Sequence, residues 1–497
     1  MANDNYWSKH PGRRLSRRAL LHLGAAGAVG LSSASLLAAC GGSNNNASSA
    51  KATVASGGGA ASQATARGTV ASAPSTAASS VAGTPRATST PASGTVSYYS
   101  GETADNEVAW YTNVINPAVK KANPDITIQG QYLDVGKDYF PKLQTALAAH
   151  NPPDFLPRNG LPTAYTLWSQ GVVDPVDDIV QTIGGDKFFP TVLESMKVGN
   201  NYLGAPLDVN CEVFFYRTDL AQQAGLKPPT NWAELLTFAK TLTQGSVYGL
   251  VTPSGRNAAT NRMFFRFLRQ NGGNIVDPDL KVVFDSPAVV EALDFIKEVS
   301  QYSPPGSGNY SYGEVRDAFY TGRAAAVITN GRVAQEFSSK NPGLADKLGA
   351  VQAPYSKEPF NYASWSVAQV FKEAKRKDLA KLWITKFEFD PQIAAQWINI
   401  APGFTFSSMP AVEQLPDYIN NPVRQKYPDI IKQLSIAAKA GGEYTKESPK
   451  HKLNPHAGEL DGGTILADVV QNVLVGGQSS KSAVQAGGKL IEALMKG

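Results

Sequence analysis

The chain has 497 residues and a formal net charge of +5 at pH 7, from 46 lysines and arginines against 41 aspartates and glutamates. Residues 1–39 hold five of the basic residues and one of the acids, so residues 40–497 carry a net charge of only +1. A nearly neutral body with no later run of basic residues excludes the electrostatic footprint of a nucleic-acid-binding protein.

The N-terminus has the layout of an export signal, in which a basic stretch precedes an apolar stretch and a cysteine. The segment SRRALL at 16–21 resembles a twin-arginine signature, and LAAC at 37–40 resembles a bacterial lipobox. We therefore expect residues 1–39 to direct export, by the twin-arginine or the general route, and Cys40 to carry the lipid anchor. The alternative is an uncleaved anchor, because residues 19–39 are long enough to span a bilayer. Either interpretation places the rest of the chain outside the cytoplasm.

Residues 41–94 are almost entirely Ala, Ser, Thr and Gly, and they contain no aromatic residue. This composition cannot bury enough apolar surface to offset the entropy of ordering, so we expect residues 40–95 to be the lipidated cysteine and a flexible tether. Cys211 is the only other cysteine. With Cys40 lipidated, no intramolecular disulfide can form, and we interpret Cys211 as a small buried hydrophobic residue.

About 400 residues follow the tether, a size that suits two lobes. Strands and helices alternate in the first part. The predicted elements are a strand at 96–99, a helix ending near 122, a strand at 126–129, a helix at 139–149, a strand at 154–156 and a helix at 164–170. This alternation predicts a parallel, doubly wound sheet with right-handed crossovers.

The rest of the chain is richer in helices. Asn231 and Glu234 form a capping box before the apolar face of a helix at 232–242. Ser286 and Pro287 have the order expected where a helix begins. Further predicted elements are a helix at 315–322, a buried strand at 324–329, a helix at 378–389 and a C-terminal helix at 482–495.

Several collinear segments resemble the extracellular solute-binding proteins of ABC sugar importers, the class to which maltose-binding protein belongs. The strongest are PLDVN at 206–210, FFYRTDL at 214–220, AGL at 224–226 and PPTNWAEL at 228–235, and weaker ones are at 267–274, 319–325 and 470–477. The resemblance covers residues 96–497. Two places depart from the family pattern: Ala363 and Ser364 stand where a Gly-Gly pair is common, and Asn330-Gly331-Arg332 stands where a tryptophan is common.

The resemblance implies an α/β fold of the periplasmic-binding-protein type, with two doubly wound lobes joined by a hinge and a ligand cleft between them. Lobe 1 would comprise 96–207 plus 365–410, and lobe 2 would comprise 208–364 plus 411–497. It also implies a monomeric, extracytoplasmic binding protein without a cofactor or catalytic activity. Such a protein captures a mono- or oligosaccharide and delivers it to the transmembrane subunits of an ABC importer by hinge closure.

Ligands of open α/β sheets bind beyond the carboxyl ends of strands. On that rule and on the resemblance, the expected ligand-binding residues are Glu102, Arg158, Asn159, Asp208, Asn210, Arg262, Asn330, Arg332 and Trp365. Trp365 either stacks on a sugar or braces the hinge, and the alternative stacking residues are Tyr99, Trp397 and Phe404.

Two other functions stay open from the sequence. One is a binding protein for a polyamine, a peptide or an iron chelate, which the ligand's charge would distinguish because an anion needs convergent arginines and a cation needs several acids. The other is an exported carbohydrate-active hydrolase, although the motifs of serine hydrolases, zinc peptidases and P-loop enzymes are absent from the sequence. His451 and His456 lie in a stretch rich in Pro and Lys without nearby clusters of acids, so we expect no metal site.

Overall fold

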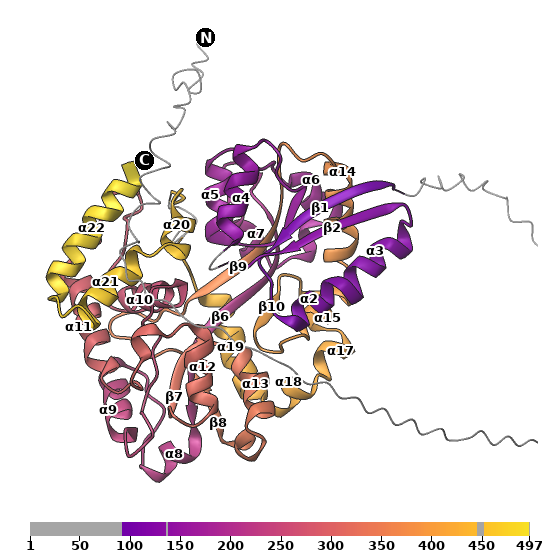
Figure 1. Ribbon diagram of the computed structural model, residues 1–497. Coiled ribbons are helices and arrows are strands. Elements are labelled where there is room, and N and C mark those ends of the chain that lie inside the picture. The colour runs from indigo at the N-terminus through magenta and orange to yellow at the C-terminus, as the bar shows by residue number, and fades with distance from the viewer. Residues whose placement is uncertain (1–91, 136–137, 445–451, 497) are drawn as a thin grey trace, which may run out of the picture. The chain divides into compact units, whose positions relative to one another are not determined.

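The computed structural model describes residues 92–135, 138–444 and 452–496. The predicted export signal, Cys40 and nearly all of the predicted tether lie outside these residues. An eight-stranded sheet forms the centre, in the order β10-β6-β9-β3-β1-β2, and β7 and β8 both pair with β6 (Figure 1). The longest strand is β6 (Ala205–Arg217), and its two halves have different neighbours.

Parallel pairing joins β1 (Gly94–Ser100) to β2 (Ile126–Tyr132) and to β3 (Phe155–Gly160). The connection from β1 to β2 is a nearly continuous helical run of α2 (Asp105–Trp110), a π-helical turn and α3 (Asn116–Ala122). The predicted strand–helix–strand alternation is therefore confirmed here. The third strand is longer than predicted, because its pairing with β9 continues to Gly160.

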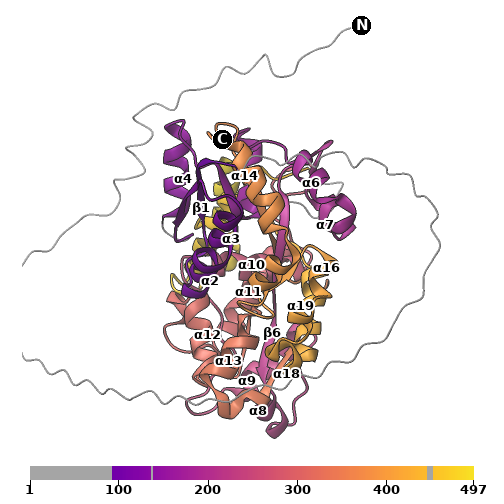
Figure 2. The ribbon, with the colours of Figure 1, turned by 90° about the vertical axis from the view of Figure 1, so that its right-hand side faces the viewer.

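The sheet is completed by antiparallel strands. One of them is β9 (Ala363–Val370), which lies between β3 and the first half of β6. The short β10 (Thr405–Ser407) lies on the other side of β6. The second half of β6 pairs with β7 (Ala326–Asn330) and β8 (Leu348–Val351). Figures 1 and 2 both show β6 running from the elements around β1 and α14 towards those around α12 and α13.

Helices surround both halves of the sheet. Those that share groups of packed apolar side chains with β1 or β3 are α4 (Tyr139–Ala148), α5 (Leu161–Ser169), α6 (Asp177–Ile183), α7 (Pro190–Ser195), α14 (Lys377–Trp383), α15 (Pro391–Ile398), α16 (Pro410–Glu413) and α17 (Pro416–Ile419). The remaining helices are α8 (Thr218–Gln223), α9 (Trp232–Leu242), α10 (Ala258–Gln270), α11 (Pro287–Ser300), α12 (Tyr312–Tyr320), α13 (Arg332–Lys340), α18 (Pro422–Lys426), α19 (Pro428–Ala440), α20 (Ala457–Gly462), α21 (Ile465–Leu474) and α22 (Ser480–Lys496).

Side-chain caps fix where several helices begin. The Asn231 side chain accepts a hydrogen bond from the backbone N–H of Glu234 (3.0 Å), which confirms the predicted start of α9. Asn257 and Asp390 cap α10 and α15 in the same way. The helix predicted at 378–389 consists of α14 followed by a π-helical run, Ile384–Glu388.

Three large groups of buried apolar side chains support this architecture. The first core lies between β1, β3, α2, α14 and α15 and includes Tyr98, Phe155 and Trp383. The second core lies around α10, α11 and α21. The third core packs on one face of β6 and includes Val209 and Cys211. The Cys211 thiol is fully buried and donates to the Leu434 carbonyl oxygen (3.1 Å), and burial raises its pKa, so the cysteine is a packing residue as expected.

Contacts group the described residues into one compact unit. The predicted division into two lobes therefore stays a prediction, although the separate cores agree with it. Within the described ranges, none of the helices combines the length and the apolar character that crossing a membrane requires.

Candidate ligand-binding site

Polar side chains line one face of the long strand β6. Asp208, Asn210 and Glu212 alternate along this strand, and alternate residues of a strand point to the same face. Cross-strand register adds five more side chains to this face: Ser364 and Ser366 of β9, Asn330 of β7, and Thr405 and Ser407 of β10. We call this set the polar face of β6. It contains three of the predicted ligand-binding residues.

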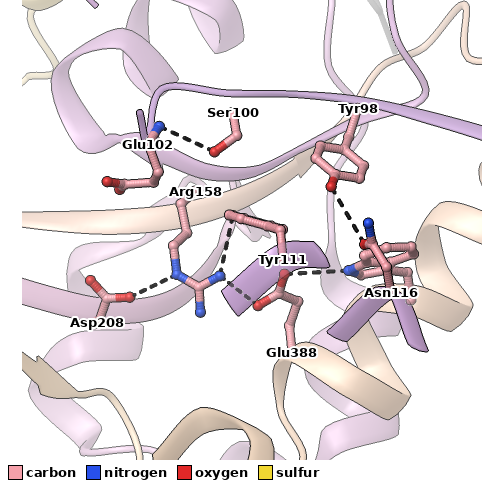
Figure 3. A network of polar contacts seen from close by, with 9 residues as sticks. Tyr98, Ser100, Glu102, Tyr111, Asn116, Arg158, Asp208 and Glu388 are labelled. Carbon is pink, nitrogen blue, oxygen red and sulfur yellow. Dashed lines mark hydrogen bonds and ion pairs between the residues drawn. The ribbon is translucent and has the colours of Figure 1, made fainter. Parts of the chain in front are cut away.

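Asp208 holds a buried arginine at one end of the polar face (Figure 3). The Arg158 Nε donates to Asp208 Oδ2 (3.2 Å), and its Nη1 donates to Glu388 Oε2 (2.7 Å). The guanidinium lies 3.9 Å from the ring centroid of Trp397 and 4.9 Å from that of Trp110. Burial raises the pKa of Asp208 and of Glu388, and the Arg158 charge opposes this rise. The arginine is thus committed to two carboxylates and two rings.

Two predicted residues lie differently from the expectation. Arg158 and Asn159 were expected after the third strand, but both lie within β3 because β9 extends its pairing. Asn159 is buried, and its Nδ2 donates to Gln369 Oε1 (3.0 Å). The Tyr139 hydroxyl donates to Asn159 Oδ1 (3.4 Å). Asn159 therefore supports the packing of α4 on the sheet and takes no part in the Arg158 network.

Glu212 holds a second buried arginine at the other end of the polar face. Arg266 of α10 donates to Glu212 Oε2, and the Tyr312 hydroxyl donates to Glu212 Oε1 (2.6 Å). Sequence reasoning named none of these three residues. Strand alternation after Asp208 and Asn210 could have pointed to Glu212, whereas Arg266 and Tyr312 carry no local signal.

The predicted Arg262 lies within α10, one turn before Arg266, and makes a bidentate ion pair. Its Nε and Nη2 donate to the two carboxylate oxygens of Asp461 (2.8 and 2.7 Å). The Tyr362 hydroxyl also donates to Asp461 (3.2 Å). The pair orients Tyr362, which directly precedes β9, and it leaves Arg262 little capacity for a charged ligand.

The predicted Arg332 and Glu102 both neighbour Glu107, a residue that sequence reasoning missed. Arg332 begins α13, which belongs to the third core, and it donates to Glu107 Oε1 of α2, which belongs to the first core. Its guanidinium lies 4.0 Å from the Phe404 ring centroid. Glu102 follows β1 as predicted, and burial together with the neighbouring Glu107 raises its pKa well above the usual range. A protonated Glu102 is both a donor and an acceptor.

Trp365 lies on the opposite face of the sheet. It is directly across from Val209 in the β6–β9 register, whereas Asp208 and Asn210 point to the other side. It is half-buried and packs against the third core. The register thus separates Trp365 from Asp208, Asn210 and Asn330.

Several buried polar groups in or near these networks have no hydrogen-bond partner within the described part of the chain. They include the Trp110 indole N–H beside Arg158, the Nε of Arg266, and the Tyr444 hydroxyl, which neighbours Tyr362. Buried donors of this kind are normally satisfied. Over the same residues, no group of three His, Cys, Asp or Glu side chains is arranged to hold a metal ion. His456 faces only Glu459 (3.8 Å), and His451 lies outside the described residues.

The family model described as bacterial extracellular solute-binding protein matches residues 117–426. The chain belongs to this family. This solute-binding protein is 24% identical over 390 residues to YcjN of Escherichia coli (strain K12), named as a periplasmic-binding protein of an ABC transporter, with 76% of this chain and 87% of that protein covered.

Two solved structures share the fold of this solute-binding protein. Maltose-bound T. maritima MalE3 superposes with a TM-score of 0.69 at 19% identity, over 80% of this chain and 99% of that one. An ABC transporter solute-binding protein from Agrobacterium radiobacter K84, in complex with ribitol, superposes with a TM-score of 0.69 at 22% identity, over 82% of this chain and 100% of that one. The predicted periplasmic-binding-protein fold is thus confirmed. Family membership confirms an extracytoplasmic binding protein of ABC transport, which is not an enzyme.

Proposed function

We propose that this solute-binding protein captures a neutral mono- or oligosaccharide, or a sugar alcohol, on the polar face of β6 and delivers it to an ABC importer. The observation that carries the proposal is the pairing of charges around this face. Arg158, Arg262, Arg266 and Arg332 each bind a carboxylate of the protein itself. An anionic solute would need an arginine that is free to bind it.

The acidic side chains around this face argue in the same way against a cationic solute. Asp208, Glu212 and Asp461 are held by arginines, and the raised pKa of Glu102 favours its neutral form. What remains for a ligand is a set of amides, hydroxyls and a carboxylic acid beside aromatic rings, which matches the hydroxyls and C–H faces of a sugar. Maltose and ribitol in the related structures agree with this chemistry.

The residues that we propose as ligand contacts are Glu102, Asn210 and Asn330, together with Asp208 and Arg332, whose ion pairs within the protein leave them able to bind a hydroxyl but not a charged group. Arg158 and Arg262 act through others, because their hydrogen bonds orient Asp208 and Tyr362. Asn159 has a packing role. Trp365 braces the hinge, and Phe404 beside Arg332 is the better stacking residue.

We propose that the lobes are those expected from the sequence, lobe 1 being 96–207 plus 365–410 and lobe 2 being 208–364 plus 411–497. The first core supports the former and the second and third cores support the latter. Leu415 and Tyr418 also pack against the first core, which favours an end of lobe 1 near 418. The Arg332–Glu107 contact would then join the lobes in a closed state.

We also propose that Cys40 carries a lipid, that the protein acts as a monomer and that the residues between Cys40 and β1 tether it beside the importer. Tethering raises the local concentration of a loaded receptor at its transporter.

The test is a thermal-shift screen of the full chain with maltose, ribitol, spermidine and citrate, followed by calorimetry. A ligand bound only by the native state raises the melting temperature. We expect a neutral sugar or sugar alcohol to do so, and Asn210→Ala to weaken its binding by about tenfold. Asn200→Ala, in the exposed turn between the short strands β4 (Lys197–Val198) and β5 (Asn201–Tyr202), is the control. Stabilisation by spermidine or citrate alone would overturn the proposal.

A further inference from the structure

A second polar surface lies on the outer face of β1 and β2, opposite the side that carries Tyr98 into the first core. The residues of this surface pair in parallel register: Thr95 with Thr127, Ser97 with Gln129, and Tyr99 with Gln131. All six are exposed or half-buried. Parallel sheets are usually covered on both faces and are then apolar on both. Hydroxyl and amide side chains in this position indicate that no layer of helices covers this face and that it is available to bind a ligand.

This face is hollowed. A cavity of about 310 Å³ is lined by Ser97, Tyr99, Gln129, Gln131, Asn151 and Lys375, among others. Its volume is at the lower end of small-molecule sites, which span roughly 300–1,000 Å³. The buried Pro152 and Pro153 also line it and supply C–H surface between the polar groups.

The charged groups around the hollow are already engaged. Asp154 accepts from the backbone N–H of Ser97 and of Arg376, both at 2.7 Å. The Lys375 Nζ donates to Asn151 Oδ1 (2.7 Å). Most of the other side chains that line the hollow are hydroxyls and amides, which carry no charge, so the lining favours a neutral ligand.

Tyr99 supplies the hollow with an aromatic ring. The ring is half-buried, one side of it joins the small apolar group formed by Leu133 and Leu143 under α4, and the Lys142 Nζ lies 5.8 Å from its centroid. An oriented ring next to planar amides is the combination that binds a sugar, because the ring covers C–H groups and the amides bind hydroxyls. A protein partner would instead need apolar or arginine anchors at the centre of the patch.

We propose that this hollow is a second binding site, which takes a short segment of a neutral glycan. It is separate from the polar face of β6 and does not depend on the ligand proposed there. A free oligosaccharide and the end of a polymer share the required chemistry. If the source is a polymer, the site would hold the tethered protein close to it and raise the local concentration of its fragments.

The test places a reporter beside the hollow. Thr127 is exposed on the same face but does not line the cavity, and Cys211 is fully buried. A full-length Cys40→Ser, Thr127→Cys protein therefore accepts an environment-sensitive fluorophore at residue 127 alone. The probes are neutral hexasaccharides of α-glucose, β-glucose and β-mannose, an insoluble polymer of each sugar for co-sedimentation, and an oligogalacturonate.

We expect at least one neutral hexasaccharide to give a saturable signal at millimolar concentration, and the charged oligosaccharide to give none. Tyr99→Ala should raise the half-saturating concentration about tenfold, whereas Tyr99→Phe keeps the ring and should keep binding. Tyr355→Ala removes another exposed tyrosine and is the matched control. Co-sedimentation with the polymer alone would identify the polymer as the source. The proposal is overturned if no neutral glycan binds in either assay, or if binding is unchanged in Tyr99→Ala.

Discussion

Asp208 and Glu212 point to the same face of β6, and each carboxylate holds one buried arginine, Arg158 at Asp208 and Arg266 at Glu212. The first arginine comes from β3 and the second from α10, so one strand ties together elements that belong to different cores. Asn210 lies between the two ion pairs on the same face. The arrangement anchors both ends of the proposed site while leaving its middle free for a ligand.

Asp208→Ala should lower the free energy of unfolding by about 3 kcal/mol or more, because breaking a buried ion pair leaves an uncompensated charge. The Arg158 and Asp208 side chains are each only 2% exposed. Urea denaturation measures the loss. The control is Asp317→Ala, whose partner Lys340 is half-exposed, and it should lose no more than about 1 kcal/mol. Equal losses in the two variants would contradict the structural role of the pair.

Arg332→Ala should weaken sugar binding by removing a contact between α13 and α2, and Glu107→Gln should act through the same contact. If the two residues hold the closed state together, their effects on the dissociation constant are not additive, and a double-mutant cycle should give a coupling of about 1 kcal/mol. Calorimetry with the sugar found in the screen provides the four affinities. Additive effects would mean that the contact does not contribute to ligand-bound closure.

Glu102 should make stability depend on pH in an unusual direction. Its pKa is raised well above 4.5 in the folded protein, so the folded state binds the proton more tightly than the unfolded chain. Stability from this group is fully present below 4.5 and falls as pH rises towards the folded pKa. The groups facing it are Glu107, Asp208 and Arg332, and Arg332 alone opposes the shift. Glu102→Gln should therefore melt higher than the wild type, by a margin that grows between pH 5 and pH 8.

Glu234 provides the control of opposite sign. Hydrogen bonds from Thr230 lower its pKa, so its stabilising effect is present at neutral pH and is lost as pH falls through the folded pKa. Glu234→Gln should melt lower than the wild type at pH 7, by a margin that shrinks in acid. Parallel pH profiles for the two variants would show that Glu102 does not carry the predicted proton.

The fold and part of the candidate site could be predicted from the sequence because both depend on patterns among residues that are close together in the chain. Alternation along 206–210 places Asp208 and Asn210 on one face, and the capping pair Asn231 and Glu234 marks the start of α9. The partners of the arginines are different. Arg158 and Glu388 are 230 residues apart, and Arg262 and Asp461 are 199 apart, so no local spacing relates them.

The positions of single residues were difficult to predict for a related reason. Whether a strand residue faces a ligand depends on where the strand ends and on its register with its neighbours. The prediction ended β3 too early, which placed Asn159 in a loop, and the sequence does not reveal that Trp365 is opposite Val209 and not opposite Asp208.

Cys40→Ala should release the protein from membranes without changing the affinity for its sugar, because residues 41–91 lack the large apolar side chains needed to pack on the folded body. Membrane fractionation of cells that express the variant measures the first effect, and calorimetry on the released protein measures the second. Ser43→Ala, in the same segment, is the control and should stay with the membrane. A Cys40→Ala protein that remains in the membrane fraction would show that the apolar segment at 19–39 is the anchor.

Trp365→Ala separates a stacking role from a bracing role. The indole packs against the third core on the face of β9 that is turned away from Asn210, so its removal should lower the melting temperature and leave sugar affinity within about twofold. Phe404→Ala is the matched comparison, because this ring lies against Arg332. Truncating a ring that stacks on a sugar in a desolvated site costs about 2 kcal/mol of binding, which is about thirtyfold in affinity. If Trp365→Ala shows the large loss of affinity and Phe404→Ala does not, the sugar binds on the opposite face of the sheet from the one proposed.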